Sequence, residues 1–463
     1  MENGTTLLTE FLSIVGAWAA AFPQARSAHR AIEQALAGLL ALGRRTLSRS
    51  LFVVGRQHRD WSADYKLHSR SEWNVQDLFQ PILEKAAPLC DDSRLVIAMD
   101  DTRIRKTGRR ILSAFYQRDP LSPKFRFNLM WGLRFLHFSL LVPLYRSHPE
   151  TPPRSLPVRF CEVPALKKPG KKASPEQVEA YRQAIRTYNL STESASLLRQ
   201  LRQSVDAAGM KTRSILAVGD GGFCNRTLFR NLPERVHILV RTRRNCRLYT
   251  AAEPGGRRFY SAQSFTPDDV RRDESTPWLE ARIFHGGQWR QVRFKEVSCV
   301  YWRTGAARQP LRLFIVAPIP HSSGKGNRKC YGEPAFLLTT DLKSPAADLL
   351  QAGFDRWQIE VNHREIKDTL GIGQAQLRNP RSVPRQPAML VAAYSALLLA
   401  GIKTFADVRS DAFPVLPKWR RNAKRPSCLD LITLLRQQAA SSPPALTGFA
   451  HLDSHKLVEA AAA

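Results

Sequence analysis

The chain has 463 residues, of which 43% are hydrophobic and 24% are charged. This length and apolar content suffice for about two or three globular domains, which excludes a disordered chain. The 70 Lys and Arg residues outnumber the 40 Asp and Glu residues and give a formal charge of +30. Such a surplus favours a polyanionic partner, and nucleic acid is a stronger candidate than a membrane surface.

The sequence gives no sign of secretion, a membrane anchor or a zinc site. No apolar run reaches the length expected of a membrane span, and the N-terminus lacks the basic region of a signal peptide. The seven cysteines show neither CxxC pairs nor the Cys/His spacing of zinc sites. We therefore expect a cytoplasmic protein with free thiols, and no membrane partner.

Residues 1–90 are predicted to form a helical DNA-binding domain. Two stretches, 28–43 and 74–87, have apolar residues at helical spacing. The segment between them is basic and carries the aromatic residues Trp61, Tyr65 and Trp73. Basic and aromatic residues between short helices favour contact with DNA, and the alternative is a helical scaffold with a basic surface.

From residue 91 the pattern changes to strands. An apolar run ends in Asp100 and Asp101, which is typical of a central strand whose carboxylates emerge at its tip. Three strands are predicted here, over residues 94–102, 125–135 and 137–146. A linker rich in Pro and Lys is expected over 147–175, followed by a helix over 176–208 that is interrupted near Asn189.

A second buried strand is predicted over residues 214–220 and ends at Asp220. Open α/β sheets place their sites at the carboxyl ends of such strands. A two-glycine turn and a helix capped by Asn225 follow, and a strand over 236–242 continues the sheet. The first part of the catalytic core is therefore assigned to residues 91–241.

Residues 242–332 are predicted to form a β-rich insertion. Short strand-like pieces alternate there with Gly, Pro and charge clusters, and the region contains Trp289 and Trp302. Its last loop lacks the spacing of a phosphate-binding P-loop, so we expect no nucleotide site. The core resumes over residues 333–385, and a helical C-terminal region follows over 386–463.

One helix is expected over residues 353–373. Four basic side chains lie within about 60° of Glu360 at 100° per residue: Arg356, His363, Arg364 and Lys367. A carboxylate among cations favours a metal ligand surrounded by phosphate-binding groups. The alternative is a solvated helix face on which Glu360 pairs with Arg356 and Arg364.

The chain thus offers three carboxylates in order: Asp100 or Asp101, then Asp220, then Glu360. Cleavage of a phosphodiester with two metal ions requires carboxylates that flank both ions, and hard oxygen ligands suit Mg²⁺ or Mn²⁺. A lone Asp at a strand tip is more often a turn or cap residue. The metal-site interpretation therefore depends on all three residues together.

The sequence resembles the DDE transposases of bacterial insertion sequences, in the group marked by Y-x2-R-x3-E-x6-K around the glutamate. The segment DRWQIEVNHREIK has Arg356, Glu360 and Lys367 at this spacing, and Gly353 stands where the tyrosine belongs. The resemblance covers about residues 90–375. MDDT is similar to the family's D-x-T, which selects Asp100 over Asp101, and VGDGGF is similar to the motif of the second aspartate.

The resemblance implies an α/β fold with a ribonuclease-H-like mixed-sheet core, interrupted by the β-rich insertion and flanked by helical regions. It also implies two Mg²⁺ or Mn²⁺ ions held by the catalytic residues Asp100, Asp220 and Glu360. The implied activity is cut-and-paste transposition, in which water and then a 3′-hydroxyl attacks the DNA. Candidate DNA contacts are the residues of the glutamate helix and two aromatic residues that stack on a flipped base: Arg356, His363, Arg364, Lys367, Trp289 and Trp302.

The implied partners are double-stranded DNA with the terminal inverted repeats, target DNA, and a second copy of the chain in a homodimer on DNA. The implied location is the bacterial cytoplasm at the nucleoid. Two other functions remain open. One is an inactive, transposase-derived protein that binds specific DNA, and the other is a metal-dependent nuclease that cuts without joining.

Overall fold

The computed structural model describes residues 6–58, 60–120, 122–123, 125–146, 151–255, 257–322, 329–420 and 423–441. The chain divides into two compact units. Unit 1 consists of Met1–Leu89, Asp101–Arg186 and Glu360–Ala463, and unit 2 consists of Cys90–Asp100 and Thr187–Ile359. The division falls inside one strand and two helices, which therefore contribute residues to both units.

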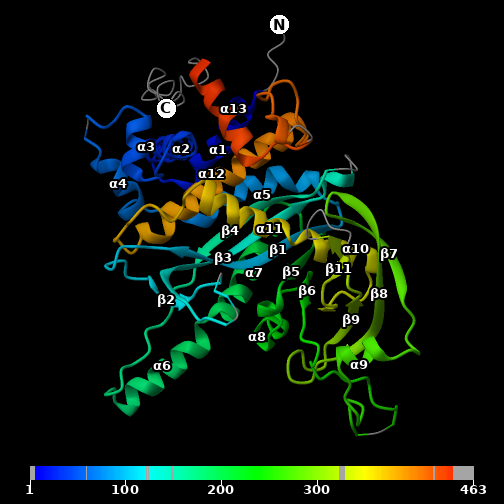
Figure 1. The fold of residues 1–463 in the computed structure, drawn as a ribbon. Coiled ribbons are helices and arrows are strands. Elements are labelled where there is room, and N and C mark those ends of the chain that lie inside the picture. The colour runs from blue at the N-terminus through cyan, green and yellow to red at the C-terminus, as the bar shows by residue number, and fades with distance from the viewer. Residues whose placement is uncertain are drawn as a thin grey trace. The chain divides into compact units, whose positions relative to one another are not determined.

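The N-terminal part of unit 1 is helical, as predicted. Its helices are α1 (Leu7–Gly16), α2 (Ala25–Leu40), α3 (Leu47–Val53), α4 (Ser62–Ser69) and α5 (Gln80–Ala86). Four of them (α1, α2, α4 and α5) contact the long helix α12 (Ser382–Phe405), which also contacts α13 (Cys428–Ser441) (Figure 1). Trp61 is exposed, whereas Trp73 is buried and donates a hydrogen bond to the Leu67 carbonyl, so Trp73 belongs to the core.

Helix α12 corrects one expectation from the sequence. Among the described helices, it is the one long and apolar enough to cross a membrane by length and composition. In the protein, 83% of its most apolar window is buried. A helix covered on all sides is apolar all round, which explains why a core helix also meets the criteria for a membrane span.

His68 on α4 is buried, with its Nε2 atom 2.8 Å from Gln34 Oε1. Burial, and then the charge of Arg385, lowers the pKa of His68 from 6.5 to about 3. As the pH falls below about 6.5, the unfolded chain therefore binds a proton that the folded chain does not. We expect this histidine to remove about 2 kcal/mol from the free energy of unfolding between about pH 7 and pH 5.

Urea denaturation at the two pH values tests this expectation. The loss of stability at the lower pH should be smaller by about that amount in His68→Gln than in the native chain, because glutamine does not titrate. An equal loss in both proteins would show that His68 is not the group responsible.

The strands of unit 1 differ from the sequence prediction. They are the end of β1 (Arg94–Arg105), β2 (Phe115–Arg118), β3 (Leu129–Val142) and β4 (Arg154–Glu162). The two strands predicted over 125–135 and 137–146 are one strand, because no turn residue separates them. Gly132 of β3 lies against the backbone of β1, where a Cβ would overlap the Ile104 carbonyl oxygen.

The predicted linker over residues 147–175 is also wrong in part, since β4 pairs antiparallel with β3 inside it. Pro157 hides this strand in the sequence, because proline is rare within sheets. It lies opposite Ser139, where the register of the pair shifts, and an irregularity of this kind accommodates a residue that has no N–H.

The long helix predicted over 176–208 is interrupted as expected. It consists of α6 (Pro175–Thr187) and α7 (Leu190–Ala207). Asn189 causes the break, because its side chain accepts hydrogen bonds from the backbone N–H groups of Ser191 and Thr192 at the start of α7.

Unit 2 contains a mixed sheet. Its strands follow the order β1, β5 (Ser214–Gly219), β6 (Val236–Arg241), β12 (Ala335–Thr339), β9 (Pro310–Val316), β8 (Gln288–Tyr301) and β7 (Leu279–His285). The pairs β1–β5 and β5–β6 are parallel and the others are antiparallel. The predicted mixed-sheet α/β class is therefore confirmed, and the strands of the predicted insertion extend the same sheet.

The remaining elements of unit 2 are the short helices α8 (Arg226–Arg230) and α9 (Pro267–Arg272), the two-stranded sheet of β10 (Pro320–Ser322) and β11 (Lys329–Tyr331), and helix α10 (Ala346–Asp355). Helix α10 contacts β5, β6 and β7. Its Leu349 and Leu350 are buried in one hydrophobic cluster with Leu216 of β5 and Phe314 of β9. This packing holds the segment before Glu360 against the sheet.

Candidate active site

Two aspartates lie at the same level of neighbouring strands. Asp220 directly follows β5, whereas β1 continues past Asp100 to Arg105 and does not end at the two aspartates as predicted. Strands β1 and β5 pair in parallel with Met99 opposite Gly219, so the next residues on the two strands are Asp100 and Asp220. Asp100 is buried. Asp220 is exposed, and its carboxylate accepts a hydrogen bond of 2.8 Å from Gly222 N. The sheet register therefore brings together two of the three carboxylates selected from the sequence.

Asp101 makes a different set of contacts. Successive residues of a strand point to opposite faces, so Asp101 faces away from the side of Asp100. Its Oδ2 atom lies 2.9 Å from Arg134 Nε and 3.7 Å from Arg103 Nη2. The Asp101 carboxylate thus pairs with two arginines on the face of β1 opposite to Asp100.

The helix predicted over 353–373 is not continuous. Helix α10 ends at Asp355, α11 spans Gln358–Arg364, and Glu365–Thr369 is π-helical. The Leu370 N–H donates to the Glu365 carbonyl at 2.9 Å, a bond that spans five residues. A π turn contains one more residue than an α-helical turn. Lys367 therefore does not lie at the angle from Glu360 that a rotation of 100° per residue predicts. π turns are frequent at functional sites.

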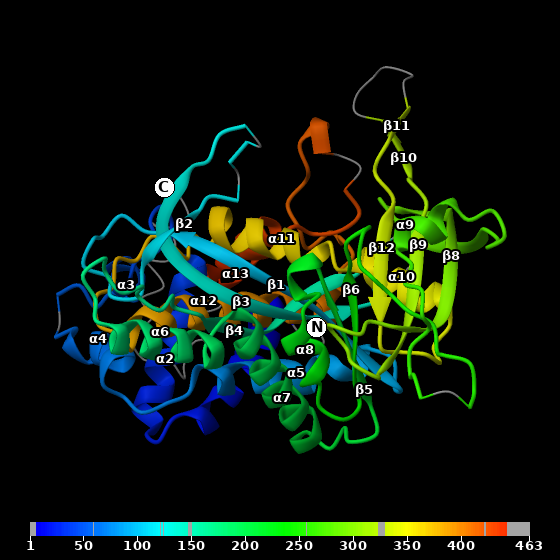
Figure 2. The same cartoon turned by 90° about the horizontal axis from the view of Figure 1, so that it is seen from below.

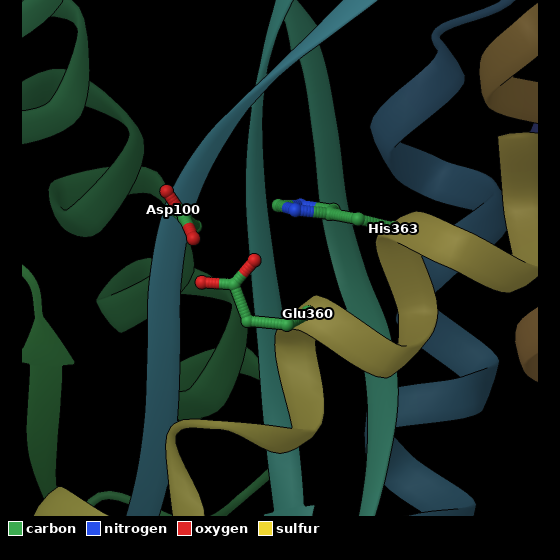
Figure 3. Close-up of side chains that lie close together, drawn as sticks. All are labelled: Asp100, Glu360 and His363. Carbon is green, nitrogen blue, oxygen red and sulfur yellow. The ribbon is translucent and has the colours of Figure 1, made fainter. Parts of the chain in front are cut away.

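Asp100, Glu360 and His363 form a group that could hold a metal ion. Among the described residues, each of the three offers one ligand atom, and these atoms lie within 4.8 Å of one another. Figure 3 shows the Glu360 carboxylate pointing toward Asp100 and the His363 ring projecting from the next turn of the same helix. Asp220 is not part of this group.

The donor set of this group fits a divalent cation. Carboxylate oxygens are the ligands preferred by Mg²⁺ and Mn²⁺. An imidazole nitrogen favours a transition metal such as Mn²⁺ over Mg²⁺. His363 is buried. Its position suits a role beside the carboxylates better than the contact with DNA phosphate expected from the sequence.

The basic residues of the glutamate helix have distinct surroundings. Arg356 Nη1 lies 3.4 Å from Asp100 Oδ2, so this guanidinium pairs with the first aspartate. Arg364 is exposed and Lys367 is half-buried. Burial, and then the charge of Lys367, lowers the pKa of His137 to about 3, which indicates that the Lys367 ammonium is near this histidine.

A buried chain of hydrogen bonds in unit 1 holds the glutamate helix, and sequence reasoning did not find it. Ser139 Oγ lies 2.8 Å from His137 Nε2 and donates to Asn362 Oδ1 at 3.2 Å. Asn362 Nδ2 lies 2.9 Å from the hydroxyl of Tyr394, which donates to Glu365. Burial, and then the charge of Glu365, raises the pKa of Tyr394 well above its usual range. The tyrosine therefore remains a neutral donor.

Unit 2 also contains a basic pocket of about 700 Å³. Its lining includes Gly221, directly after Asp220, together with Trp302 and Tyr249. Four arginines complete its basic wall: Arg226, Arg243, Arg247 and Arg303. Trp302 packs edge-to-face on Phe229 with ring centroids 5.4 Å apart.

The two tryptophans selected from the sequence lie in different surroundings. Trp289 on β8 packs against Phe284 with ring centroids 5.5 Å apart, and Arg282 lies 5.1 Å from its ring centroid. It does not line the basic pocket. Of these two tryptophans, Trp302 is the one that lines the cavity beside the second aspartate.

Comparison with known protein families agrees with this geometry. The family model of the transposase DDE domain matches residues 180–396. This segment includes Asp220 and Glu360, while Asp100 precedes it. No curated protein matches the chain.

Proposed function

We propose that this chain, which carries a transposase DDE domain, cuts DNA at the ends of a transposable element and joins those ends to a target. The observation that carries the proposal is the group of Asp100, Glu360 and His363, whose ligand atoms lie within 4.8 Å of one another. Carboxylates gathered in a chain with a formal charge of +30 suit metal-dependent chemistry on DNA better than DNA binding alone.

Asp100, Asp220 and Glu360 are the proposed ligands of two Mg²⁺ or Mn²⁺ ions. When bound, such ions stabilise negative charge on the attacking and leaving oxygens of a phosphodiester. Strand and helix positions keep these carboxylates rigid. The Asp220 carboxylate, which now accepts a bond from Gly222 N, would have to turn from this contact to act as a ligand.

His363 is proposed to bind one of the metal ions, or to lie directly beside the carboxylates that bind them. Replacement of His363 by Asn is expected to lower activity with Mn²⁺ more than activity with Mg²⁺, because the imidazole nitrogen favours the transition metal. Cleavage rates with each metal, measured over a range of concentrations, give the comparison. An equal loss with both metals would argue for a role outside coordination.

The proposed DNA contacts of the glutamate helix are Arg356, Arg364 and Lys367. Arg364 is exposed and is therefore available to a phosphate. Arg356 would either break its ion pair with Asp100 to bind a DNA phosphate, or keep that ion pair and hold the aspartate in place. Guanidinium groups bind phosphate through paired hydrogen bonds, so replacement of either arginine by Lys is not conservative.

Trp302 is proposed to stack on a base in the arginine-lined pocket. Trp302→Ala is expected to weaken binding to end DNA by about tenfold, since stacking on one base contributes about 1–3 kcal/mol. Trp289→Ala is the matched control and should change the affinity by less than about twofold. Fluorescence anisotropy with labelled end DNA measures both variants, and an equal effect of the two would contradict the assignment.

The test of the function is an assay with DNA that carries the ends of the flanking element, with Mg²⁺, with Mn²⁺, or with EDTA. Cut and joined products that require the metal support the transposase. Cut products without joining support the alternative of a nuclease. A mobility shift without cutting under either metal supports the inactive DNA-binding protein.

The active form is proposed to be a homodimer on DNA at the bacterial nucleoid.

A further inference from the structure

The connection between β2 and β3 in unit 1 exposes an unusual number of apolar side chains. Phe125 is 91% exposed and Phe127 is 64% exposed. Three further large side chains beside them are also exposed: Leu112, Tyr116 and Leu129. Figure 2 shows this connection, drawn in cyan, extending beyond the strands that it joins. Isolated exposed apolar residues are common, but a contiguous set indicates an interaction site.

Four residues of the paired strands share one face of the hairpin. Tyr116 pairs with Trp131, and Arg118 pairs with Leu129, in the antiparallel ladder of β2 and β3. These positions alternate with Gln117 and Met130, which are buried on the other face. Side chains alternate between the two faces of a strand. One face of this hairpin is therefore part of the core, and the other is exposed or half-exposed among the described residues.

Arginines interleave with the aromatic rings on this face. Arg109 lies 5.5 Å from the ring centroid of Tyr116 and 5.7 Å from that of Trp131. Arg118 lies 5.6 Å from the ring centroid of Phe127. Rings with stacked guanidinium groups are the combination that proteins use to hold unstacked bases and their phosphates.

Hydrogen bonds join several of the described residues between β2 and β3. Asp119 N–H donates to the Asn128 carbonyl at 2.9 Å, and Asn128 N–H donates to Ser122 Oγ at 3.2 Å. The Arg126 N–H donates to the Pro123 carbonyl at 3.1 Å. Phe125 lies among these residues and is exposed.

The charge of the segment indicates which partner covers this face. Residues 105–129 contain seven Lys and Arg residues and a single acidic residue, Asp119. Arg105 pairs with that aspartate at 2.9 Å, and four other arginines are exposed: Arg109, Arg110, Arg118 and Arg126. Two copies of this surface would repel each other, whereas a polyanion would neutralise it.

We propose that this hairpin is a target-DNA contact that inserts Phe125 and Phe127 between unstacked bases, with its arginines on the flanking phosphates. The inference rests on the proposed function. Stacking accepts any base, so it suits a DNA partner that has no fixed sequence, such as the target. Apolar wedges of this kind hold DNA in a bent form.

The test uses the full chain and two DNA probes without element ends. One is a matched duplex, and the other is the same duplex with a short mismatch bubble that contains 2-aminopurine. Native protein is expected to bind the bubble more tightly and to change the 2-aminopurine fluorescence. The variant with both Phe125→Ala and Phe127→Ala should lose at least about tenfold in affinity for the bubble, with binding to end DNA unchanged.

Two control variants sharpen the test. Trp419→Ala removes an exposed aromatic residue from another part of unit 1 and should leave affinity for the bubble unchanged. The variant with both Phe125→Leu and Phe127→Leu keeps the apolar surface without the rings. It should therefore recover less than half of the binding free energy for the bubble that the double alanine variant loses. The three substituted positions are exposed, and circular dichroism of each variant checks that it folds.

Either of two results would overturn the proposal. One is equal affinity of the double variant and the native chain for the bubble. The other is unchanged DNA affinity together with a changed molar mass by light scattering, which would make the face an interface between copies. Neither measurement requires cleavage, so failure of the proposed catalytic function would be seen separately in the assay on element ends.

Discussion

Glu360→Gln is expected to abolish cutting and joining while the protein still binds the element's ends. The substitution keeps the size of the side chain and removes the charge that a divalent cation requires. We expect the cleavage rate to fall by at least about a thousandfold, which corresponds to about 4 kcal/mol of transition-state stabilisation. Rates come from single-turnover cleavage of labelled end DNA, and binding comes from a mobility shift on the same DNA.

The neighbouring aspartates provide matched controls. Asp100→Asn and Asp220→Asn should cause a loss as large as that of Glu360→Gln. Asp101→Asn should retain most activity, because the Asp101 carboxylate pairs with Arg134 and Arg103. If Asp101→Asn is inactive and Asp100→Asn is active, the assignment of the first ligand is reversed. Full cleavage by Glu360→Gln would remove the basis of the metal site.

Asp407→Asn is expected to cause the largest loss of stability among these variants. Asp407 is fully buried after the end of α12. Its Oδ1 atom lies 2.5 Å from Arg154 Nη2, and its Oδ2 atom lies 2.9 Å from Arg425 Nε. Removing the carboxylate charge leaves two buried guanidinium groups without their counter-ion. Breaking a buried ion pair in this way costs about 3–5 kcal/mol.

Asparagine makes this test specific to charge. Asp407 has a φ of 60°, a left-handed conformation that asparagine tolerates well, so the backbone should not contribute to the loss. Asp411→Asn, at an exposed position, is the control and should change the free energy of unfolding by less than about 0.5 kcal/mol. Urea denaturation measures both variants, and similar stability of the two would contradict the role given to the ion pair.

The sequence was most informative where the signal is local. The apolar runs that end at Asp100 and Asp220 predicted two buried strands, and the structure has β1 and β5 there, paired in parallel. The break near Asn189 was also predicted. Its cause is local, since the Asn189 side chain caps the helix that begins at the next residue.

Predictions from local sequence periodicity were wrong where tertiary packing determines the secondary structure. Local periodicity did not predict β4, because Pro157 looks like a linker residue until its position opposite Ser139 is known. It also treated residues 353–373 as one helix and missed the π turn at Glu365–Thr369. Helical arithmetic assumes a constant angle per residue, and a single extra residue in a turn changes the angle of everything beyond it.

By itself, the sequence determined the charge, the α/β class, the three candidate carboxylates and the spacing that resembles a transposase. All of these depend on composition or on residues close together in the chain. Only the tertiary structure decided that Ser139 contacts Asn362, that Asp407 is buried between Arg154 and Arg425, and that the hairpin of β2 and β3 presents its aromatic face to solvent. Such contacts join residues far apart in sequence, and they form only when the packing of the whole fold brings the side chains together.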